Sequence, residues 1–340
     1  MITAKKGIKR SVQLGDDCVC YFSGITGKDL FSEPKIYKET YTRGYNSLKE
    51  IFGDEFKYVY MPPISCPSCS YGHMACLGAT VTYPDGGDYS MKPFISSVKE
   101  GIDLLKKDVD FTANDLYKYF AAYNDQLDND FTDKKILFGG FGAEGPITSA
   151  VLMRGQDFFI DMYDQPDECI EFLTLLTDSI IKFHQFFRKK NNQPVFSNGV
   201  IGLCDDFGSL VTPDNFVKFV TPFWDKYYSS LASGERRLHA EGMFRPHLSK
   251  LKYARIDHFQ PSVSPGLTCH MCAEELDIDF DWMLPSYEII YMNETQIDDW
   301  ITDTISAKPD IVRTQMIRDT FSLNKEKLIL HFLENVKAYE

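Results

Sequence analysis

The sequence predicts an α/β protein built as a (β/α)8 TIM-type barrel with an elaborated N-terminal segment. Short runs of β-branched and aromatic residues alternate along the chain with longer amphipathic stretches, an order typical of parallel strands joined by helices. Eight such runs can be counted, and eight parallel strands close a barrel. Their apolar residues need not alternate, because strands of this class are buried on both faces. A doubly wound open sheet is the alternative.

The eight predicted strands share an apolar run that ends near a turn or a polar residue. They are residues 18–24, 57–65, 135–142, 194–202, 236–244, 255–263, 287–294 and 310–317. We expect a single barrel domain over 1–340, with residues 1–55 as an N-terminal extension packed on it. The stretch "ATVTYPDGGDYSMKP", residues 79–93, suggests an extra hairpin or lid.

Helices are predicted between these strands from their start signals. The stretch 149–165 leads into 166–190, which has a proline in its first position and acidic residues in its first turn. The helical stretch 212–233 begins with Thr212 as N-cap and Pro213 behind it. The last two helical stretches, 293–307 and 324–340, each begin with an asparagine cap.

Charge and composition exclude several classes of protein. The formal net charge of −13 argues against a nucleic-acid partner, because phosphate binding draws on clustered lysine and arginine. No run of 18 apolar residues is present, so a membrane span is not expected. No apolar signal-peptide stretch follows the basic N-terminus, and the nine cysteines fit reduced thiols. The prediction is a cytoplasmic protein.

The strand "RRLHAEGMF" places His239 and Glu241 two positions apart, so that both side chains point to the same face, about 6.5 Å apart. In a barrel strand they would lie near the C-terminal end, where barrel active sites are built. Gly242 lets the backbone turn and leaves space for a ligand. We favour a metal site. The alternative is a polar pair whose members satisfy each other.

The segment "SPGLTCHMCAEELD" adds two thiols, Cys269 and Cys272, just past the end of the next predicted strand. Neighbouring strands of a barrel bring their C-terminal ends together. Imidazole, carboxylate and thiolate ligands with a fourth position open are the pattern of a catalytic zinc. The predicted metal ligands are therefore His239, Glu241 and Cys269 or Cys272. The alternative is a helical cysteine pair buried as small apolar groups.

Two further motifs are weaker. Cys66 and Cys69 form a C-x-x-C pair, but the surrounding prolines favour a loop over a redox dithiol. "GGFGAEG", residues 139–145, has the spacing of a dinucleotide fingerprint, yet Pro146 follows at once and the strand before it is not the first. A strand-end loop that points Glu144 into the barrel mouth is the favoured interpretation.

Three acidic residues are candidates for binding substrate or handling protons. Glu144 ends the glycine-rich loop, and Asp205 and Asp206 follow the fourth predicted strand. Because Thr212 is expected to cap the next helix, the two aspartates are left free for a functional role.

Three consecutive segments resemble the uroporphyrinogen decarboxylase superfamily. They carry a Gly-Pro turn, an Asp before a Ser/Thr-Pro-acid helix start, and a His-bearing strand, in the order typical of that superfamily. The segments are "GAEGPITSAVLMRGQDFFIDMYDQPDECIEFLTLLTDSIIKF", "DDFGSLVTPDNFVKFVTPFWDKYY" and "RLHAEGMFRPHLSKLKYARIDHFQ". The resemblance runs from about residue 55 to the C-terminus and implies a (β/α)8 barrel.

Within the superfamily the chain resembles the corrinoid-dependent methyltransferases. The arginine-rich signature of the decarboxylases has no counterpart in "VCYFSGITGKDLFSEPKIY". The resemblance implies that His239 binds zinc and that a methyl group moves from a methylated small molecule to a corrinoid, cobalamin, on a partner protein. Glu241 stands where a cysteine is usual. A carboxylate makes zinc harder and better suited to polarising an oxygen, which favours a methyl ether substrate and an O-demethylase component.

Two other functions remain open. One is a metal-free decarboxylase of the same fold. The other is a non-catalytic barrel that binds a corrinoid or another ligand.

Overall fold

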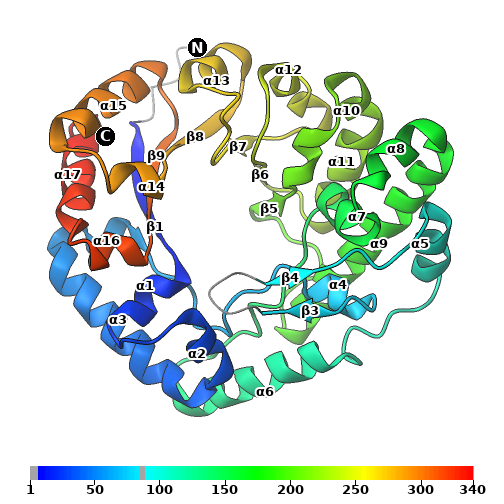
Figure 1. Ribbon diagram of the computed structural model, residues 1–340, viewed down its shortest axis with the longest axis horizontal. Helices are drawn as coiled ribbons and strands as arrows, with labels where there is room; N and C mark the ends of the chain where they lie inside the picture. The colour runs from blue at the N-terminus through cyan, green and yellow to red at the C-terminus, as the bar shows by residue number, and fades with distance from the viewer. Residues whose placement is uncertain (1–6, 84–88, 340) are drawn as a thin grey trace. The chain divides into compact units, whose positions relative to one another are not determined.

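Residues 7–83 and 89–339 are described by the computed structural model, and they divide into two units. Unit 1 comprises the two ends of the chain, up to residue 64 and from residue 260 onward. Unit 2 is the continuous stretch 65–259. In Figure 1 the colours of unit 1 are blue and gold to red, and those of unit 2 run from cyan to yellow.

Unit 1 contains a parallel sheet with the strand order β2-β1-β9-β8. The strands are β1 (Lys9–Leu14), β2 (Val59–Tyr60), β8 (Asp279–Leu284) and β9 (Ile311–Met316). Val12 of β1 lies opposite Val59 of β2 on one side and Thr314 of β9 on the other. β1 therefore lies inside the sheet, and the segment 1–55 contributes a strand. The division into a single domain with an N-terminal extension stays a prediction.

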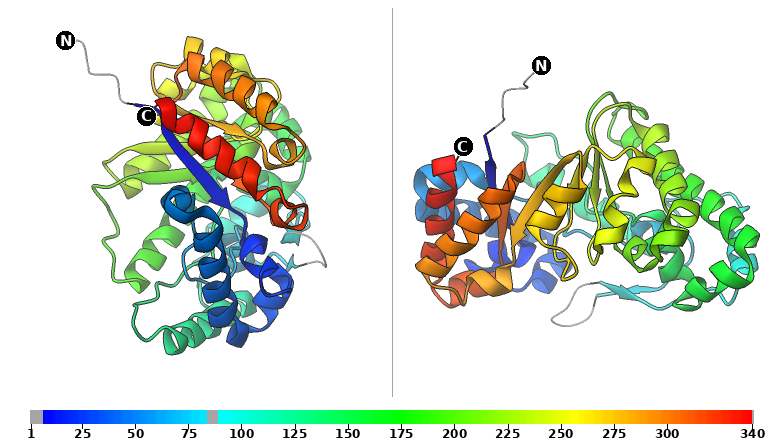
Figure 2. Two further views of the ribbon diagram at one scale, coloured as in Figure 1. Left: turned by 90° about the vertical axis from the view of Figure 1, so that its left-hand side faces the viewer. Right: turned by 90° about the horizontal axis from the view of Figure 1, so that it is seen from above.

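The helices of unit 1 cover this sheet and form its core. They are α1 (Asp16–Tyr21), α2 (Gly27–Ser32), α3 (Tyr37–Phe52), α13 (Cys269–Glu275), α14 (Ser286–Ile289), α15 (Glu294–Ala307), α16 (Arg318–Ser322) and α17 (Glu326–Val336). Figure 2 shows α17 running beside β1. Val12, Val312, Leu48, Ile297 and Phe332 are fully buried in one apolar cluster. Burial of these side chains supplies the main stabilisation of unit 1.

Unit 2 has the strand order β7-β6-β5. The strands are β5 (Ile201–Cys204), β6 (Arg236–His239) and β7 (His258–Gln260), whose last residue falls past the boundary of the unit. β5 and β6 are parallel, and their last residues, Cys204 and His239, lie opposite each other. The predicted extra hairpin is confirmed as β3 (Val81–Thr82) paired antiparallel with β4 (Ser90–Met91), with its turn at 84–88 outside the described residues.

The helices of unit 2 include the predicted long helix, α9 (Pro166–Lys190). Pro166 occupies its first turn with acidic residues, and basic residues occupy its last turn, as the helix dipole favours. It buries Phe172, Leu176 and Ile180 completely and packs against α11. The other helices are α4 (Gly72–Cys76), α5 (Val98–Leu105), α6 (Asp115–Asp130), α7 (Pro146–Arg154), α8 (Asp157–Asp164), α10 (Pro213–Phe219), α11 (Thr221–Leu231) and α12 (Arg245–Leu248).

Three of the eight predicted strands are wrong. Residues 18–24 overlap helix α1, where Val19 packs against the glycine at position 44 of α3. Residues 287–294 overlap α14, because Pro285 ends β8 and starts a helix. In 135–142 the isolated bridge of Phe141 with Cys69 is the strand pairing that the structure describes. Short apolar runs do not distinguish a strand from a buried helix by their periodicity.

The other five runs contain strands that are shorter than predicted. They correspond to β2, β5, β6, β7 and β9. The run 194–202 is displaced furthest, since β5 begins only at Ile201. Pro194 cannot donate to a ladder, and the residues before Ile201 pair through a single bridge between Ser197 and Ala232.

The predicted helix caps have mixed outcomes. Asn293 caps α15 in a full capping box, as predicted. At α10 the described structure has no cap hydrogen bond from the side chain of Thr212, although Pro213 starts the helix as expected. The last helix, α17, starts behind Lys325, so the predicted asparagine cap is wrong. Among the described residues, no helix is both long and apolar enough to span a bilayer.

Candidate metal centre

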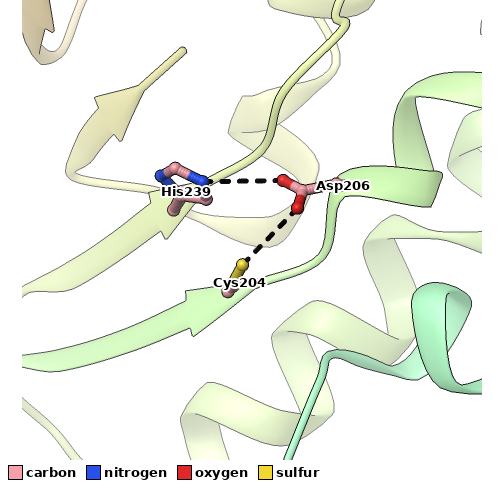
Figure 3. A group of neighbouring side chains, drawn as sticks. All are labelled: Cys204, Asp206 and His239. Carbon is pink, nitrogen blue, oxygen red and sulfur yellow. Dashed lines mark hydrogen bonds and ion pairs between the residues drawn. The ribbon is translucent and has the colours of Figure 1, made fainter. Parts of the chain in front are cut away.

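The ends of β5 and β6 bring together, in unit 2, three side chains of types that commonly ligate metals. Cys204 ends β5, His239 ends β6, and Asp206 opens the short 3-10 helix η3 (Asp206–Leu210). Figure 3 shows the carboxylate of Asp206 between the imidazole and the thiol. Its Oδ1 lies 3.7 Å from Nε2 of His239, and its Oδ2 lies 3.8 Å from Sγ of Cys204. One donor atom from each residue lies within 4.8 Å of the other two.

These separations suit a zinc ion. Tetrahedral zinc with ligands at about 2.0–2.3 Å puts neighbouring donor atoms about 3.3–3.8 Å apart. Glu241, which the sequence predicts as a ligand, lies outside this group of three and has its Oε1 3.7 Å from Nε2 of His239. Imidazole, thiolate and carboxylate donors are all ordinary zinc ligands. The residues present therefore fit the metal.

The local backbone holds the carboxylate of Asp206 in this place. The backbone N–H of Glu241 donates to its Oδ1 at 2.9 Å. Gly242, which follows, has a φ of 68°, a value that glycine adopts without strain. The side chains of His239, Asp206 and Glu241 are 30%, 34% and 44% exposed, so a small molecule can reach them from solvent.

Glu144 lies beside this group and has a perturbed carboxyl. Burial and the nearby charge of Asp206 raise its pKa to about 7, against the opposing hydrogen bonds of Ser70 and Cys204. Burial and the same two carboxylates raise the pKa of the Cys204 thiol far above its ordinary value. The thiol therefore remains protonated unless a cation compensates its charge.

Asp205 is fully buried, and its carboxylate accepts three hydrogen bonds. The donors are the backbone N–H of Ile147 at 3.1 Å, that of Thr148 at 2.6 Å, and Nε1 of Trp224 at 2.6 Å. The two amides belong to the first turn of α7, so Asp205 caps that helix. Burial raises its pKa to about 6, although these hydrogen bonds favour the charged form.

The predicted thiols of Cys269 and Cys272 belong to unit 1, in α13. Both are buried, and Sγ of Cys269 lies 3.8 Å from the carbonyl oxygen of Thr304. Burial raises the pKa of both thiols, that of Cys272 to about 12. Their role as ligands stays a prediction.

The two weaker motifs pack against each other. The N–H of Cys69 donates to the carbonyl of Gly140 at 2.6 Å, and that of Gly142 donates to Cys69 at 2.8 Å. A Cβ at Gly140 would collide with the carbonyl of Cys66. Close backbone packing thus accounts for the glycines and for the buried position of the C-x-x-C pair.

Cys204 is the member of the group that sequence reasoning missed. It ends an apolar run two residues before Asp206. Its side chain therefore lies at the C-terminal end of a strand, the same position that identified His239 as a candidate. The predicted strand 194–202 ended too early to include it. A strand boundary two residues later would have placed it opposite His239.

Comparisons with known proteins agree with this architecture. The structure of a methyltransferase from Methanosarcina mazei superposes with a TM-score of 0.67 at 13% identity, covering 99% of this chain and 95% of that one. This likeness confirms the predicted α/β fold class of the TIM-barrel type. The family model "Uroporphyrinogen decarboxylase (URO-D)" matches residues 61–269, and the chain belongs to this family. No curated protein matches the sequence.

Proposed function

We propose that the protein is a zinc-dependent methyltransferase that transfers a methyl group from a methylated small molecule to a corrinoid carried by a partner protein. Membership of the URO-D family and the fold shared with a methyltransferase support the transferase class. The donor group at the ends of β5 and β6 supports the metal. Of these observations, the spacing of Cys204, Asp206 and His239 carries the proposal.

His239 would hold zinc through Nε2, Cys204 through its thiolate and Asp206 through a carboxylate oxygen. Glu241 stands within reach of the same position. When bound, zinc supplies a Lewis acid that draws charge from a substrate heteroatom. A site with more carboxylate than thiolate is hard, and hard sites favour oxygen, so we infer a methyl ether as the substrate.

Glu144 supplies the proton in this scheme. Its half-buried carboxyl lies beside Asp206 and Cys204, where burial favours the protonated form. The reaction breaks the bond between carbon and oxygen, and the oxygen keeps the electron pair. The electron pair for the new bond to the methyl carbon would come from the reduced corrinoid carried by the partner protein. The proton of Glu144 then neutralises the leaving alkoxide or phenolate.

The first test is the metal content of protein purified without chelator. We expect about one zinc per chain, lost in His239→Ala and Cys204→Ala. Cys272→Ala and Cys269→Ala remove the thiols that the sequence predicts as ligands. Retention of zinc in both supports Cys204 as the thiolate ligand. Loss of zinc in either of them, with retention in Cys204→Ala, would restore the ligand set of the sequence prediction.

The second test is methyl transfer from a methoxylated aromatic compound to chemically reduced cobalamin, followed by the change in the visible spectrum. We expect turnover that is abolished in His239→Ala and reduced in Glu144→Gln, which cannot release a proton. The control is wild-type protein without a methyl donor. Decarboxylation of a porphyrinogen by metal-free protein would instead favour the rival function of the family.

A further inference from the structure

Asp205 and Thr148 hold Asp206 from both sides. Asp205 precedes it, and its Oδ1 accepts the backbone N–H of Thr148 at 2.6 Å. Phe207 follows it, and its N–H donates to Oγ1 of Thr148 at 3.1 Å. The residues on either side of Asp206 are therefore bonded to a single residue in the first turn of α7. We call these two bonds the Asp205–Thr148 clamp.

The same turn also fixes Glu144. The backbone N–H of Gly145 donates to the carbonyl of Cys204 at 2.7 Å, and the hydroxyl of Ser149 donates to the carbonyl of Glu144 at 3.1 Å. A Cβ at Gly145 would lie 2.5 Å from Cγ of Asp205, so the segment before α7 and the segment after β5 leave no room for a side chain between them. The start of α7 and the end of β5 thus form one rigid corner of unit 2.

We propose that Asp205 is a positioning residue of the metal centre: through the clamp it sets the placement of Glu144, Cys204 and Asp206 relative to His239. This inference rests on the proposed function for its metal but concerns residues that touch neither metal nor substrate. The buried Asp205 directs its carboxylate at the amides of α7 and at Trp224. Partners of this kind orient the ligands, and their removal typically lowers metal affinity about 10- to 100-fold.

The test uses substituted cobalt(II), whose spectrum reports a bound thiolate. We expect Asp205→Asn to weaken cobalt and zinc binding about 10- to 100-fold and to alter the thiolate band. Thr148→Val is nearly isosteric, keeps the charge of Asp205 and removes the acceptor for Phe207, and we expect the same direction of change. Thr148→Ser keeps the hydroxyl that Thr148→Val removes, so this variant should bind cobalt and zinc as wild type does.

Ser97→Ala is the matched control, because Ser97 caps α5 in unit 2 through the N–H of Glu100 at 3.2 Å. It removes the side-chain cap of a helix without touching the metal centre. If Asp205→Asn and Thr148→Val lose stability but bind cobalt(II) with the affinity and spectrum of Ser97→Ala, the role of the clamp is only structural and the proposal is wrong.

A readout without metal separates this inference from the proposed function. Alkylation of Cys204 in apo-protein, resolved by peptide mass spectrometry, measures how firmly the end of β5 is held. We expect alkylation to be several-fold faster in Thr148→Val than in wild type or Thr148→Ser. If wild type binds no metal and this difference is present, the proposed function fails and the clamp stands. Equal alkylation rates would overturn the clamp whatever the metal result.

Discussion

At the scale of single residues, Gly145 shows how little space separates α7 from β5. A Cβ there would overlap the side chain of Asp205 and lie 2.7 Å from the carbonyl oxygen of Cys204. These neighbours are held by hydrogen bonds and cannot yield without moving the metal centre. Overpacking of this kind usually destabilises a fold.

We expect Gly145→Ala to lower the free energy of unfolding by about 1–3 kcal/mol, measured by urea denaturation. Gly202→Ala is the matched control in β5 itself, where no described atom lies within 4 Å of the added Cβ. That change should stay within about 0.5 kcal/mol of wild type. Equal stability of the two variants would contradict the close contact at Gly145.

Two histidines of unit 2, the buried His73 and the half-buried His184, make stability sensitive to acid. Burial, and the neighbouring charge of His184, lower the pKa of His73 to about 3. Burial, and the charge of Arg188, lower the pKa of His184 to about 4. The unfolded chain binds protons at about pH 6.5, so both histidines favour unfolding as the pH falls below that value.

The predicted loss of unfolding free energy between pH 7 and pH 5 is about 2 kcal/mol for each histidine. His73→Gln and His184→Gln should each flatten this dependence, followed by urea denaturation at several pH values. Ser97→Ala, which removes a helix cap but no titratable group, should leave the pH dependence as steep as in wild type. An unchanged slope in the His73→Gln, His184→Gln double variant would refute the assignment.

The sequence reveals some residues of the site and hides others for physical reasons. His239 and Glu241 were predicted to share a face, and they lie 3.7 Å apart. In the sequence, only its position after a strand marks Asp206 as a site residue. Its placement in η3 depends on hydrogen bonds to α7, which the sequence does not reveal. The buried state of Asp205 was not foreseeable, since two of its three partners lie 57 and 58 positions away along the chain and the third, Trp224, lies 19 positions away.

At the scale of elements, the helix starts show which local signals determine structure. Oδ1 of Asn293 accepts from the backbone N–H of Gln296 at 3.0 Å, and Oε1 of Gln296 accepts from the backbone N–H of Asn293 at 2.9 Å, so the cap of α15 is complete. Thr212 occupies a similar place before α10, but there Pro213 and the acidic first turn start the helix. The type of the N-cap residue thus predicts where a helix begins, but it does not predict whether that side chain accepts the cap hydrogen bond.

We expect Asn293→Ala to lower the free energy of unfolding by about 1 kcal/mol, because the backbone N–H of Gln296 in the first turn of α15 loses its acceptor. Thr212→Ala should change it by less than about half of that, since no cap hydrogen bond from this side chain is described. Thermal or urea denaturation measures both. A larger loss in Thr212→Ala would show that the hydroxyl bonds the helix in solution.

The strand predictions failed where tertiary contacts decide. The run 18–24 is as apolar as β1, yet it turns into α1 because Val19 fills the space left by the glycine at position 44. The strand β8 was missed because "DFDWML" is interrupted by aspartates, one of which, Asp281, is buried in an ion pair with Arg313. In a sequence, the charged residues of a buried ion pair cannot be told from charged residues on an exposed surface.

At the scale of the whole molecule, the fold class was predictable because it depends on alternation and not on each boundary. Five of the eight runs contain strands, β1 and β8 were missed, and the class is nevertheless correct. The extent of the URO-D match, 61–269, also shows that the family signal is concentrated in the middle of the chain.

Metal binding should stabilise the molecule in a localised way. Zinc at about 100 times its dissociation constant adds about 2.7 kcal/mol to the unfolding free energy, so a chelator should lower the melting temperature. The effect should vanish in His239→Ala. In hydrogen exchange, the amides of β5 and β6 should gain protection from zinc, because all four proposed donors belong to unit 2. Protection confined to β1 and β9 would place the metal elsewhere.

The pairing of β1 with β9 has a consequence for how the protein folds during translation. Lys9 must find Ile311, and about 300 residues of synthesis separate them. At about 5–20 residues per second, the ribosome takes roughly 15 to 60 seconds to cover this distance. Throughout that interval β1 lacks its neighbour β9 on one edge. Unit 2, residues 65–259, is complete before β9 is synthesised and can fold earlier. Among the described strands β1 is thus synthesised first but reaches its full pairing late, and until then its edge is open to chaperones, proteases and wrong pairing.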